Sequence, residues 1–260
     1  YGNWSKMKIF KFKIIIFGFF CSLIFSKETL GLVTKSKGKV EYKNFSEKKF
    51  SKDVYRGLGL YGDDRIRTGD NGFSIYRYLD DASSIKILKN SDVQIQGRVD
   101  TRNIVKQVEV NNGVLNFNID KQNTSNFTIV TPTSIATVKG TDFWLVCNGP
   151  EGDKFFGVEG DVEIKNIESG SIVVLQENSV VISDSNGNIL AQNMSTQDLQ
   201  QIENLNEESG EYEDINIDTG SDDNINEELD NISDSNEENI IRLQFEDSFG
   251  NSKEIIIKYK

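Results

Sequence analysis

Apolar and β-branched residues occur in short runs along residues 31–192, and Gly, Asn, Asp or Ser separates one run from the next. Within most runs apolar and polar residues alternate, which is the pattern of a strand with one buried face. The runs cover residues 31–35, 38–43, 64–68, 73–79, 84–88, 92–96, 104–110, 113–119, 126–130, 142–147, 161–167, 171–175 and 179–183. A protein built from βαβ units would need helical stretches of roughly 10 to 15 residues between its strands, and none separates these runs. The pattern predicts an all-β domain over residues 31–192, with many short strands forming a β-sandwich or a β-roll.

One stretch after these runs has helical spacing. Ser195 is followed three positions later by Asp198, which fits a capping box at a helix N-terminus. Three apolar residues would share the packing face of this helix, namely Leu199, Ile202 and Leu205. A short helix is therefore predicted over residues 195–206.

The chain then changes character twice. Residues 207–239 are rich in Glu, Asp, Asn, Ser and Gly and hold no Lys or Arg. Such a segment repels itself and buries too little apolar surface to offset its ordering entropy, so a disordered acidic linker is predicted. Two β-branched runs, 240–247 and 252–260, flank a turn and predict a C-terminal β-hairpin over residues 240–260. Because an isolated two-stranded hairpin is only marginally stable in water, we expect it to dock on the main β domain.

The formal net charge of −12 comes from one part of the chain. Residues 201–240 hold 15 Asp and Glu residues and no Lys or Arg, so the remaining residues sum to +3. A nucleic-acid-binding protein needs a basic patch or stripe that neutralises phosphates, and neither part of the chain offers one. The charge pattern excludes nucleic acid as the expected partner.

The N-terminal residues resemble an export signal. Lysines follow Met7, the apolar run 14–25 comes next, and Ser26 is a small residue at a cleavage position. Twelve apolar residues are shorter than the roughly 20 that span a bilayer as a helix. We expect residues 1–26 to be a cleaved signal peptide and the mature protein to be periplasmic or secreted. Because Met7 is the first methionine, translation that starts there and leaves residues 1–6 untranslated is an alternative. The alternatives are an uncleaved anchor in the inner membrane, which would be the only membrane contact, and a buried core helix. A lipoprotein is disfavoured because Cys21 lacks a small residue before it.

The sequence offers little of the chemistry that enzymes and metal sites use. Histidine is absent, which excludes Ser-His-Asp and Cys-His nucleophile pairs and the commonest zinc ligand. The carboxylate pairs Asp63-Asp64 and Asp80-Asp81 lie in turn signals, where solvated loop residues are expected rather than a general acid and base. Cys147 lies in a predicted strand, where a lone thiol is expected to be buried and inert. We expect no enzymatic activity, no cofactor and no metal.

Two alternatives are open for the role of four aromatic residues in predicted strands. The residues are Tyr76, Tyr78, Phe155 and Phe156. They would line a sugar-binding or peptide-binding face if they pointed outward, but aromatic residues in strands more often pack in the core or across strands. Core packing is the favoured interpretation.

The stretch "TPTSIATVKGTDFW", residues 131–144, carries the most specific pattern in the chain. Pro132 lacks an N–H and holds the residue before it extended, which suits the start of an edge strand. Ala136 and Val138 then alternate as inward positions, and Gly140 permits a bend or a close backbone approach. The stretch is predicted to turn a strand across a corner of the β core, as a structural element rather than a binding site.

The order of several motifs resembles the FecR domain family. The motifs are "GKVEY" (38–42), "GLGLYGDDRIRTGDNGF" (57–73), "DDASSIKIL" (80–88), "SDVQI" (91–95), "VEVNNGVLNF" (108–117), "FTIVTPTSIATVKGTDF" (127–143) and "GVEGDVEIKN" (157–166). The family-motif residues, expected to be structural, are Gly62, Asp63, Thr68, Gly69, Thr131, Pro132, Gly140, Thr141, Phe143 and Gly160. The resemblance implies a periplasmic or secreted β domain. The family's namesake also has a cytoplasmic half that regulates a sigma factor, and because no such half is recognised here, we expect no direct sigma-factor regulation.

These observations support two functional hypotheses. The first is a non-enzymatic exported binding or sensing module of the bacterial envelope, whose partner is an envelope protein or a glycan. The second is a structural component that links the β domain to the cell wall or to neighbouring proteins. A hydrolase that uses paired acids is disfavoured because its carboxylates are expected in solvated turns.

Overall fold

The computed structural model describes residues 28–50, 54–100, 103–122, 126–214, 240–246 and 252–258. The predicted signal peptide lies outside these residues, and so do residues 215–239 of the predicted acidic linker. The chain divides into two compact units, residues 1–215 and 216–260, which are described separately. Within the described residues, no helix is long and apolar enough to span a membrane.

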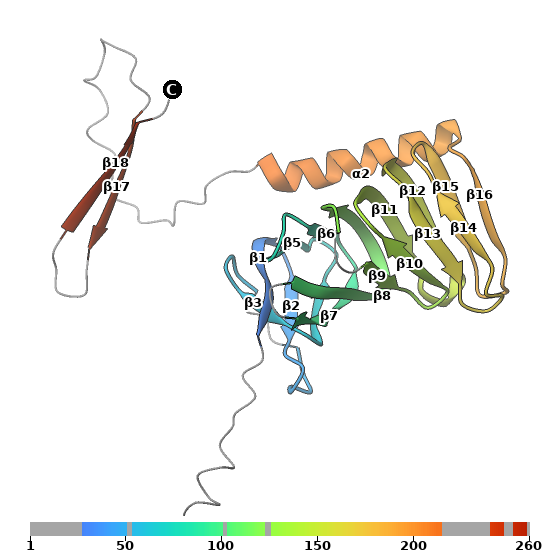
Figure 1. Ribbon diagram of the computed structural model, residues 1–260, viewed down its shortest axis with the longest axis horizontal. Helices are drawn as coiled ribbons and strands as arrows, with labels where there is room; N and C mark the ends of the chain where they lie inside the picture. Colours follow the sequence, from blue (N-terminus) through green and yellow to red (C-terminus); the bar gives the residue numbers. More distant parts are fainter. Residues whose placement is uncertain are drawn as a thin grey trace, which may run out of the picture. The chain divides into compact units, whose positions relative to one another are not determined.

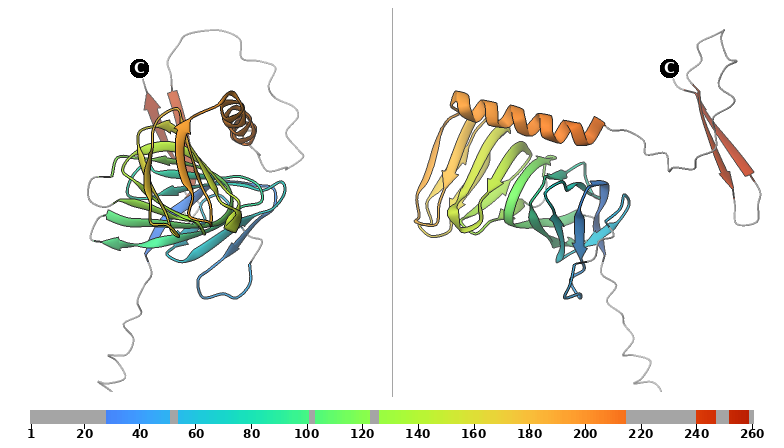
Figure 2. Two further views of the ribbon diagram at one scale, coloured as in Figure 1. Left: turned by 90° about the vertical axis from the view of Figure 1, so that its right-hand side faces the viewer. Right: turned by 180° about the vertical axis from the view of Figure 1, so that it is seen from behind.

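The first unit is an all-β structure in which two sheets face each other across one core (Figures 1 and 2). Sheet A contains, in spatial order, β3 (Gly59–Tyr61), β1 (Thr29–Lys37), β5 (Phe73–Tyr78), β6 (Ser84–Ile87), β8 (Asn103–Ile119), β11 (Thr141–Cys147), β12 (Asp153–Glu159), β15 (Ser179–Ser183) and β16 (Ile189–Asn193). Sheet B contains β2 (Val40–Lys43), β4 (Asp64–Thr68), β7 (Asp92–Asp100), β8 again, β9 (Phe127–Val130), β10 (Ser134–Val138), β13 (Val162–Asn166) and β14 (Ile172–Leu175). A single 3-10 turn, η1 (Gly149–Glu151), precedes β12. The arrangement is sandwich-like and is not closed into a barrel, which confirms the predicted fold class.

Strand β8 belongs to both sheets. Its N-terminal half pairs with β7 and, in parallel, with β9, while its C-terminal half pairs with β6 and β11. The sequence predicted two strands here, 104–110 and 113–119, and that division is wrong because the chain stays extended through Gly113. This glycine has a φ of 127°, and a Cβ atom on it would lie 2.2 Å from Ser91 Oγ. Only glycine fits this position, so the break read from the sequence is a bend within one strand.

The core follows from the alternation of side chains along the strands. In β10, Ala136 and Val138 are fully buried, as the sequence predicted, and in the neighbouring β13 Val162 and Ile164 are buried in the same way. Successive side chains of a strand point to opposite faces, so each strand contributes every second residue to the space between the sheets. The favoured alternative for the aromatic residues is also confirmed. Tyr76, Tyr78, Phe155 and Phe156 are all buried.

A helix that follows β16 covers the outer face of sheet A (Figure 2). This helix, α2, spans Thr196–Asp214. It covers a second apolar cluster formed by Phe73, Leu88, Trp144, Phe156 and Val180, against which Met194, Ile202 and Leu205 pack. The sheet therefore buries apolar residues on both of its faces, which explains the continuous apolar runs in β11, β12 and β15.

The predicted helix is present, but two details of it were wrong. The capping box forms as expected, since the Asp198 amide donates to Ser195 Oγ at 3.2 Å and Asp198 Oδ2 accepts from the Ser195 amide at 2.9 Å. Leu199 is exposed because the packing stripe begins one position earlier, at buried Asp198. The helix also continues to Asp214, so the first eight residues of the predicted linker are helical. Contacts with the β domain continue past residue 206, since Glu208 forms an ion pair with Lys89, in the turn between β6 and β7, at 3.0 Å.

The second unit contains the predicted C-terminal hairpin. Strands β17 (Ile240–Glu246) and β18 (Ser252–Lys258) pair antiparallel, with Ile240 opposite Lys258 and Glu246 opposite Ser252. The hairpin in the sequence prediction is confirmed, and its docking on the main β domain stays a prediction.

Removal of the Asp198 charge is expected to loosen α2 in a pH-dependent way. Burial alone would raise the pKa of Asp198, but hydrogen bonds from Lys154 and Ser195 lower it from 3.8 to about 2. A carboxylate with a lowered pKa stabilises the folded state above its unfolded pKa, and this contribution is lost as the pH falls through the folded pKa. Asp198→Asn should therefore lower the free energy of unfolding by about 1 kcal/mol at pH 7 and by much less near pH 2.

Urea unfolding followed by the fluorescence of Trp144, which lies under α2, is the measurement. A Trp4→Phe background removes the second tryptophan of the chain. An equal difference between variant and parent at both pH values would show that the Asp198 charge does not hold the helix.

Candidate functional site

Four of the family-motif residues, Gly62, Asp63, Thr68 and Gly69, lie in or beside turns and stabilise them. Gly62 and Asp63 form the turn between β3 and β4, and Asp63 adopts a positive φ of 70°. Thr68 Oγ1 donates to the Leu88 carbonyl at 2.6 Å and accepts from the Ser91 amide at 2.9 Å. The carbonyl of Gly69 accepts from two amides, those of Gly72 at 3.1 Å and Asn90 at 2.9 Å. These residues fix loops, as expected for structural motif positions.

The aspartate next to this turn is buried, which corrects the expectation of a solvated pair at Asp63-Asp64. Asp64 is fully buried and accepts the Tyr42 hydroxyl at 2.8 Å, the Tyr61 amide at 2.9 Å and the Phe45 amide at 3.1 Å. Both carboxylate oxygens are therefore engaged by donors from three segments. Asp64 anchors the loop after β2 to the β3–β4 turn, and Asp63 alone is exposed.

The threonines of the "TPT" motif surround a second buried carboxylate. Thr131 Oγ1 and Thr133 Oγ1 both donate to Asp153 Oδ2, and the side chain of Asp153 is 2% exposed. Thr131 Oγ1 also accepts from the Ser134 amide at 2.8 Å, which closes the turn between β9 and β10. Pro132 is exposed at the tip of this turn. The expectation that it starts an edge strand is wrong, because β10 pairs on both sides, with β9 and β13.

Two motif glycines, Gly140 and Gly160, lie close together where the chain crosses between the two sheets, and these two crossings are called the stacked corners below. Between β10 and β11 the chain crosses from sheet B to sheet A at Gly140, which has a φ of 149°, and a Cβ there would lie 3.0 Å from Lys121 Cα. Gly160, at the return crossing from β12 to β13, has a φ of 76°, and its Cβ would lie 2.9 Å from the Gly140 carbonyl oxygen. Thr141 is buried beside this contact, and Phe143 stacks on Phe117 with ring centroids 5.2 Å apart. The predicted corner is therefore observed.

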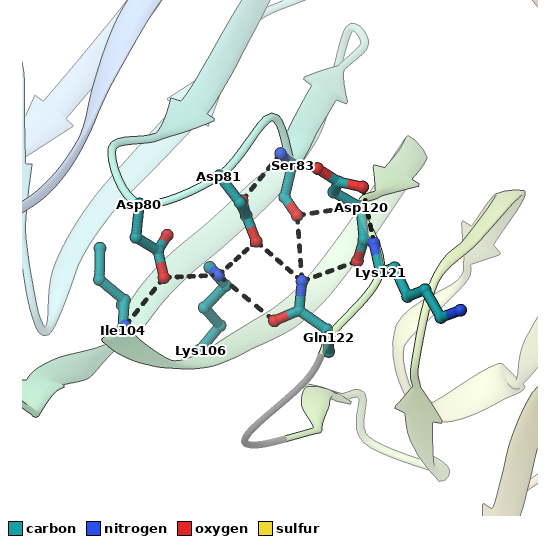
Figure 3. Close-up of polar contacts among 8 residues, drawn as sticks. All are labelled: Asp80, Asp81, Ser83, Ile104, Lys106, Asp120, Lys121 and Gln122. Carbon is teal, nitrogen blue, oxygen red and sulfur yellow. Dashed lines mark hydrogen bonds and ion pairs between the residues drawn. The ribbon is translucent and has the colours of Figure 1, made fainter. Parts of the chain in front are cut away.

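A charged cluster that the sequence prediction missed lies between the β5–β6 loop and β8 (Figure 3). Lys106, in β8, is 2% exposed. Its Nζ atom donates to Asp80 Oδ2 at 2.9 Å, to Asp81 Oδ2 at 2.7 Å and to Gln122 Oε1 at 3.3 Å. The ammonium also lies 5.3 Å from the centroid of the Tyr78 ring. The side chains of Asp80 and Asp81 are thus only 13% and 18% exposed and are paired with Lys106, which corrects the expectation of a solvated second carboxylate pair.

The cluster satisfies its own polar groups. An ammonium has three N–H donors, and all three of Lys106 have acceptors. Asp80 also accepts from the Ile104 amide at 2.8 Å, and Asp81 from the Ser83 amide at 2.9 Å. Burial alone would raise the pKa of Asp81, but hydrogen bonds from Lys106, Gln122 and Ser83 hold this pKa below its ordinary value of 3.8. The cluster therefore holds a closed ion pair that joins a loop to the central strand.

A signal for this cluster was present in the sequence. In the run "IVKQVEV", residues 104–110, the inward positions are 104, 106, 108 and 110, so the alternation places Lys106 among buried apolar residues. A lysine is almost never fully buried without a partner. Its partners could not be chosen from the sequence, because the chain has 41 acidic residues.

The remaining candidates carry no reactive arrangement. Cys147 is buried and lies opposite Asp153 in the β11–β12 ladder. Burial, with the nearby Asp153 charge, raises the pKa of its thiol from 9.0 to about 12, so the thiolate is disfavoured, as the sequence predicted. Among the described residues, no group of three His, Cys, Asp or Glu side chains is placed to hold a metal ion.

Lys106→Met should be strongly destabilising, because it leaves two half-buried carboxylates without their cation. The expected loss is about 3 to 5 kcal/mol in the free energy of unfolding at pH 7. The loss should shrink as the pH falls toward 4, because the unpaired carboxylates can then bind protons. Asp81→Asn is the control, and it should cost less because Asp80 still neutralises Lys106. Urea unfolding of all three proteins measures this, and a Lys106→Met loss below 1 kcal/mol would show that the cluster does not hold the loop.

Gly140→Val should lower the free energy of unfolding by about 1 to 3 kcal/mol, because it places a β-branched residue at a positive φ and against Lys121. Gly170→Val is the matched control. Gly170 also has a positive φ, of 69°, but no atom lies within 4 Å of its Cβ position. Thermal melts of both variants measure the difference. A Gly140→Val variant that melts within a degree of wild type would show that the corner does not require glycine at this position.

Comparison with known proteins gives a family match within the β domain. The family model described as FecR protein matches residues 64–163. Two crystal structures of an anti-sigma factor candidate from Parabacteroides distasonis ATCC 8503 are similar to this chain, with 20% and 21% identity and TM-scores of 0.44 and 0.43. Each match covers 52% of this chain and 62% of the other, so the chain spans less than two thirds of those proteins. No curated protein matches the chain. The matched residues include the charged cluster, the "TPT" turn and the stacked corners, and the chain therefore contains a FecR family domain.

Proposed function

We propose that the chain is a non-enzymatic binding module of the bacterial cell envelope, which acts by contacting another protein. The FecR domain supports a role in sensing or regulation, because the family's namesake receives a signal through this domain. A glycan partner is less well supported, since the four aromatic residues that would have stacked on sugars are buried.

The observation that carries this proposal is how the polar residues of the FecR domain are used. The three donors of Lys106 are taken up by side chains of the domain, and Asp64 and Asp153 are held by donors from neighbouring segments. Catalytic acids and bases instead need free access to a substrate in a shared cleft. These charged groups stabilise loops, which favours a rigid scaffold that presents a surface.

The N-terminal pattern supports export of this module. A basic segment after Met7 and the apolar run 14–25 precede the small residue Ser26. Cell fractionation with N-terminal sequencing should find the protein outside the cytoplasm, with its N-terminus near residue 27. A protein that stays in the cytoplasm and retains Met7 would contradict export.

Chemical cross-linking in intact cells tests the binding role. We expect one discrete cross-linked protein partner, at a stoichiometry that saturates with expression level. Lys106→Met is the control for folding, since a specific partner should be lost when the domain is destabilised. Recovery in bulk with cell-wall material, without a discrete partner, would instead favour the structural hypothesis.

A further inference from the structure

One end of the β-sandwich presents unpaired strand edges. Strand β16 is the last strand of sheet A and pairs only with β15, and β14 is the last strand of sheet B and pairs only with β13, among the residues that the structure describes. Apolar side chains at this end are exposed. They are Ile172 and Val174 on β14, Ile182 on β15 and Leu190 on β16, and Leu190 is 57% exposed.

The hydrogen-bond phase of β16 shows which of its backbone groups point away from the sheet. In an antiparallel ladder, hydrogen-bonded pairs alternate with non-hydrogen-bonded pairs. The Met194 amide donates to the Asn178 carbonyl at 3.1 Å, and the Asp184 amide donates to the Asn188 carbonyl at 3.0 Å. The register between these two bonds is regular, so the positions 190 and 192 bond to β15. The N–H and C=O groups of Ile189, Ala191 and Asn193 therefore face outward, at the free edge.

This edge lacks the features that usually prevent strand addition. Native edge strands are commonly protected by Lys, Pro or a β-bulge. Strand β16 has the sequence "ILAQN", and its ladder with β15 has no register shift. An open hollow of about 650 Å³ lies beside it, lined by Val173, Ile182, Ile189 and Leu190 together with polar residues of the adjoining turns. The hollow has room for apolar side chains of an added strand.

Charge indicates what kind of strand fits this edge. Residues 166–241 contain no Lys or Arg, so every charged side chain of β14, β15, β16, α2 and their turns is acidic. Exposed Glu168 and Glu177 lie in the turns that flank β14. A second copy of the chain would bring an equally acidic end to this edge, and like charges oppose association. A partner that carries Lys or Arg would be attracted.

We propose that β16 accepts an added strand from a protein partner, and that this strand has apolar residues at alternate positions and Lys or Arg at its ends. Its backbone pairs with Ile189, Ala191 and Asn193. Its apolar side chains cover the hollow between β14 and β16, and its basic ends contact the acidic turns. This inference rests on the proposed binding function and names the surface and the partner chemistry of that function.

The test uses Ala191→Pro, which removes one outward N–H without touching the bonds to β15. Proline is tolerated on an edge strand when its nitrogen faces solvent. Ala191→Val is the matched control, because it changes the same position and keeps the N–H. Circular dichroism and melting temperature should be the same for both variants, which shows that the fold is retained. If Ala191→Pro fails to fold, Ala191 with an N-methylated peptide bond, introduced by semisynthesis, removes the same donor.

The probe is a synthetic nine-residue peptide of alternating Val or Ile and Thr with a lysine at each end, and a second peptide has glutamates in place of the lysines. Fluorescence anisotropy should show saturable binding of the lysine peptide to the full chain, at least tenfold tighter than the glutamate peptide. Ala191→Pro should weaken binding of the lysine peptide at least tenfold, and Ala191→Val should not.

Three results would overturn the inference. The first is equal binding by Ala191→Pro and wild type, which would place the peptide elsewhere. The second is no binding of the lysine peptide by wild type. The third is a dimer in sedimentation experiments that Ala191→Pro abolishes, which would make the occupant a second copy. A discrete cross-linked partner that persists with Ala191→Pro would sustain the proposed function while removing this edge as its site.

Discussion

The first unit depends on the continuity of β8, because this one strand is shared by two sheets that face each other. A strand of 17 residues can serve both sheets only if it bends without leaving the extended conformation. Gly113 allows that bend, since its backbone conformation and the close approach of Ser91 both exclude a side chain. The pairing of β7 and β9 on one half and of β6 and β11 on the other follows from this geometry.

Strand β8 also carries a buried charge on its N-terminal half. Lys106 lies on an inward position of this half and contacts the β5–β6 loop. Two aspartates of that loop and Gln122, just after β8, then supply the acceptors. Asp153 in the same way holds the turn between β9 and β10, and the glycines at 140 and 160 allow the close approach of two crossings between the sheets. Gly140 and Gly160, two residues on which the resemblance to the FecR family rests, thus lie at these corners.

Sequence periodicity was sufficient for the fold class because alternating burial is a local property of each strand. It predicted the inward positions of β10 and the capping box at Ser195. It failed where the outcome depends on residues distant in sequence. Glycine at 113 could mean a turn or a bend, and only pairing with β7 and β11 decides between them. The carboxylates at 64, 80 and 81 lie in turns but are covered by Tyr42, Phe45 and Lys106, which no local pattern indicates. The extension of α2 past residue 206 is likewise accompanied by a contact with a residue distant in sequence, the ion pair of Glu208 with Lys89.

Lys106, Asp64 and Asp153 are occupied in holding turns of the β domain, and the proposed binding function therefore rests on the surface and the strand edges of this domain. The most direct measurement is amide hydrogen exchange of the free protein, resolved by residue with NMR. The account predicts an alternating pattern along β16, in which the amides of Leu190 and Gln192 exchange slowly and those of Ile189, Ala191 and Asn193 exchange rapidly. Uniform protection of all five amides would show that the edge is already paired, and would contradict the assignment of β16 as the open binding edge.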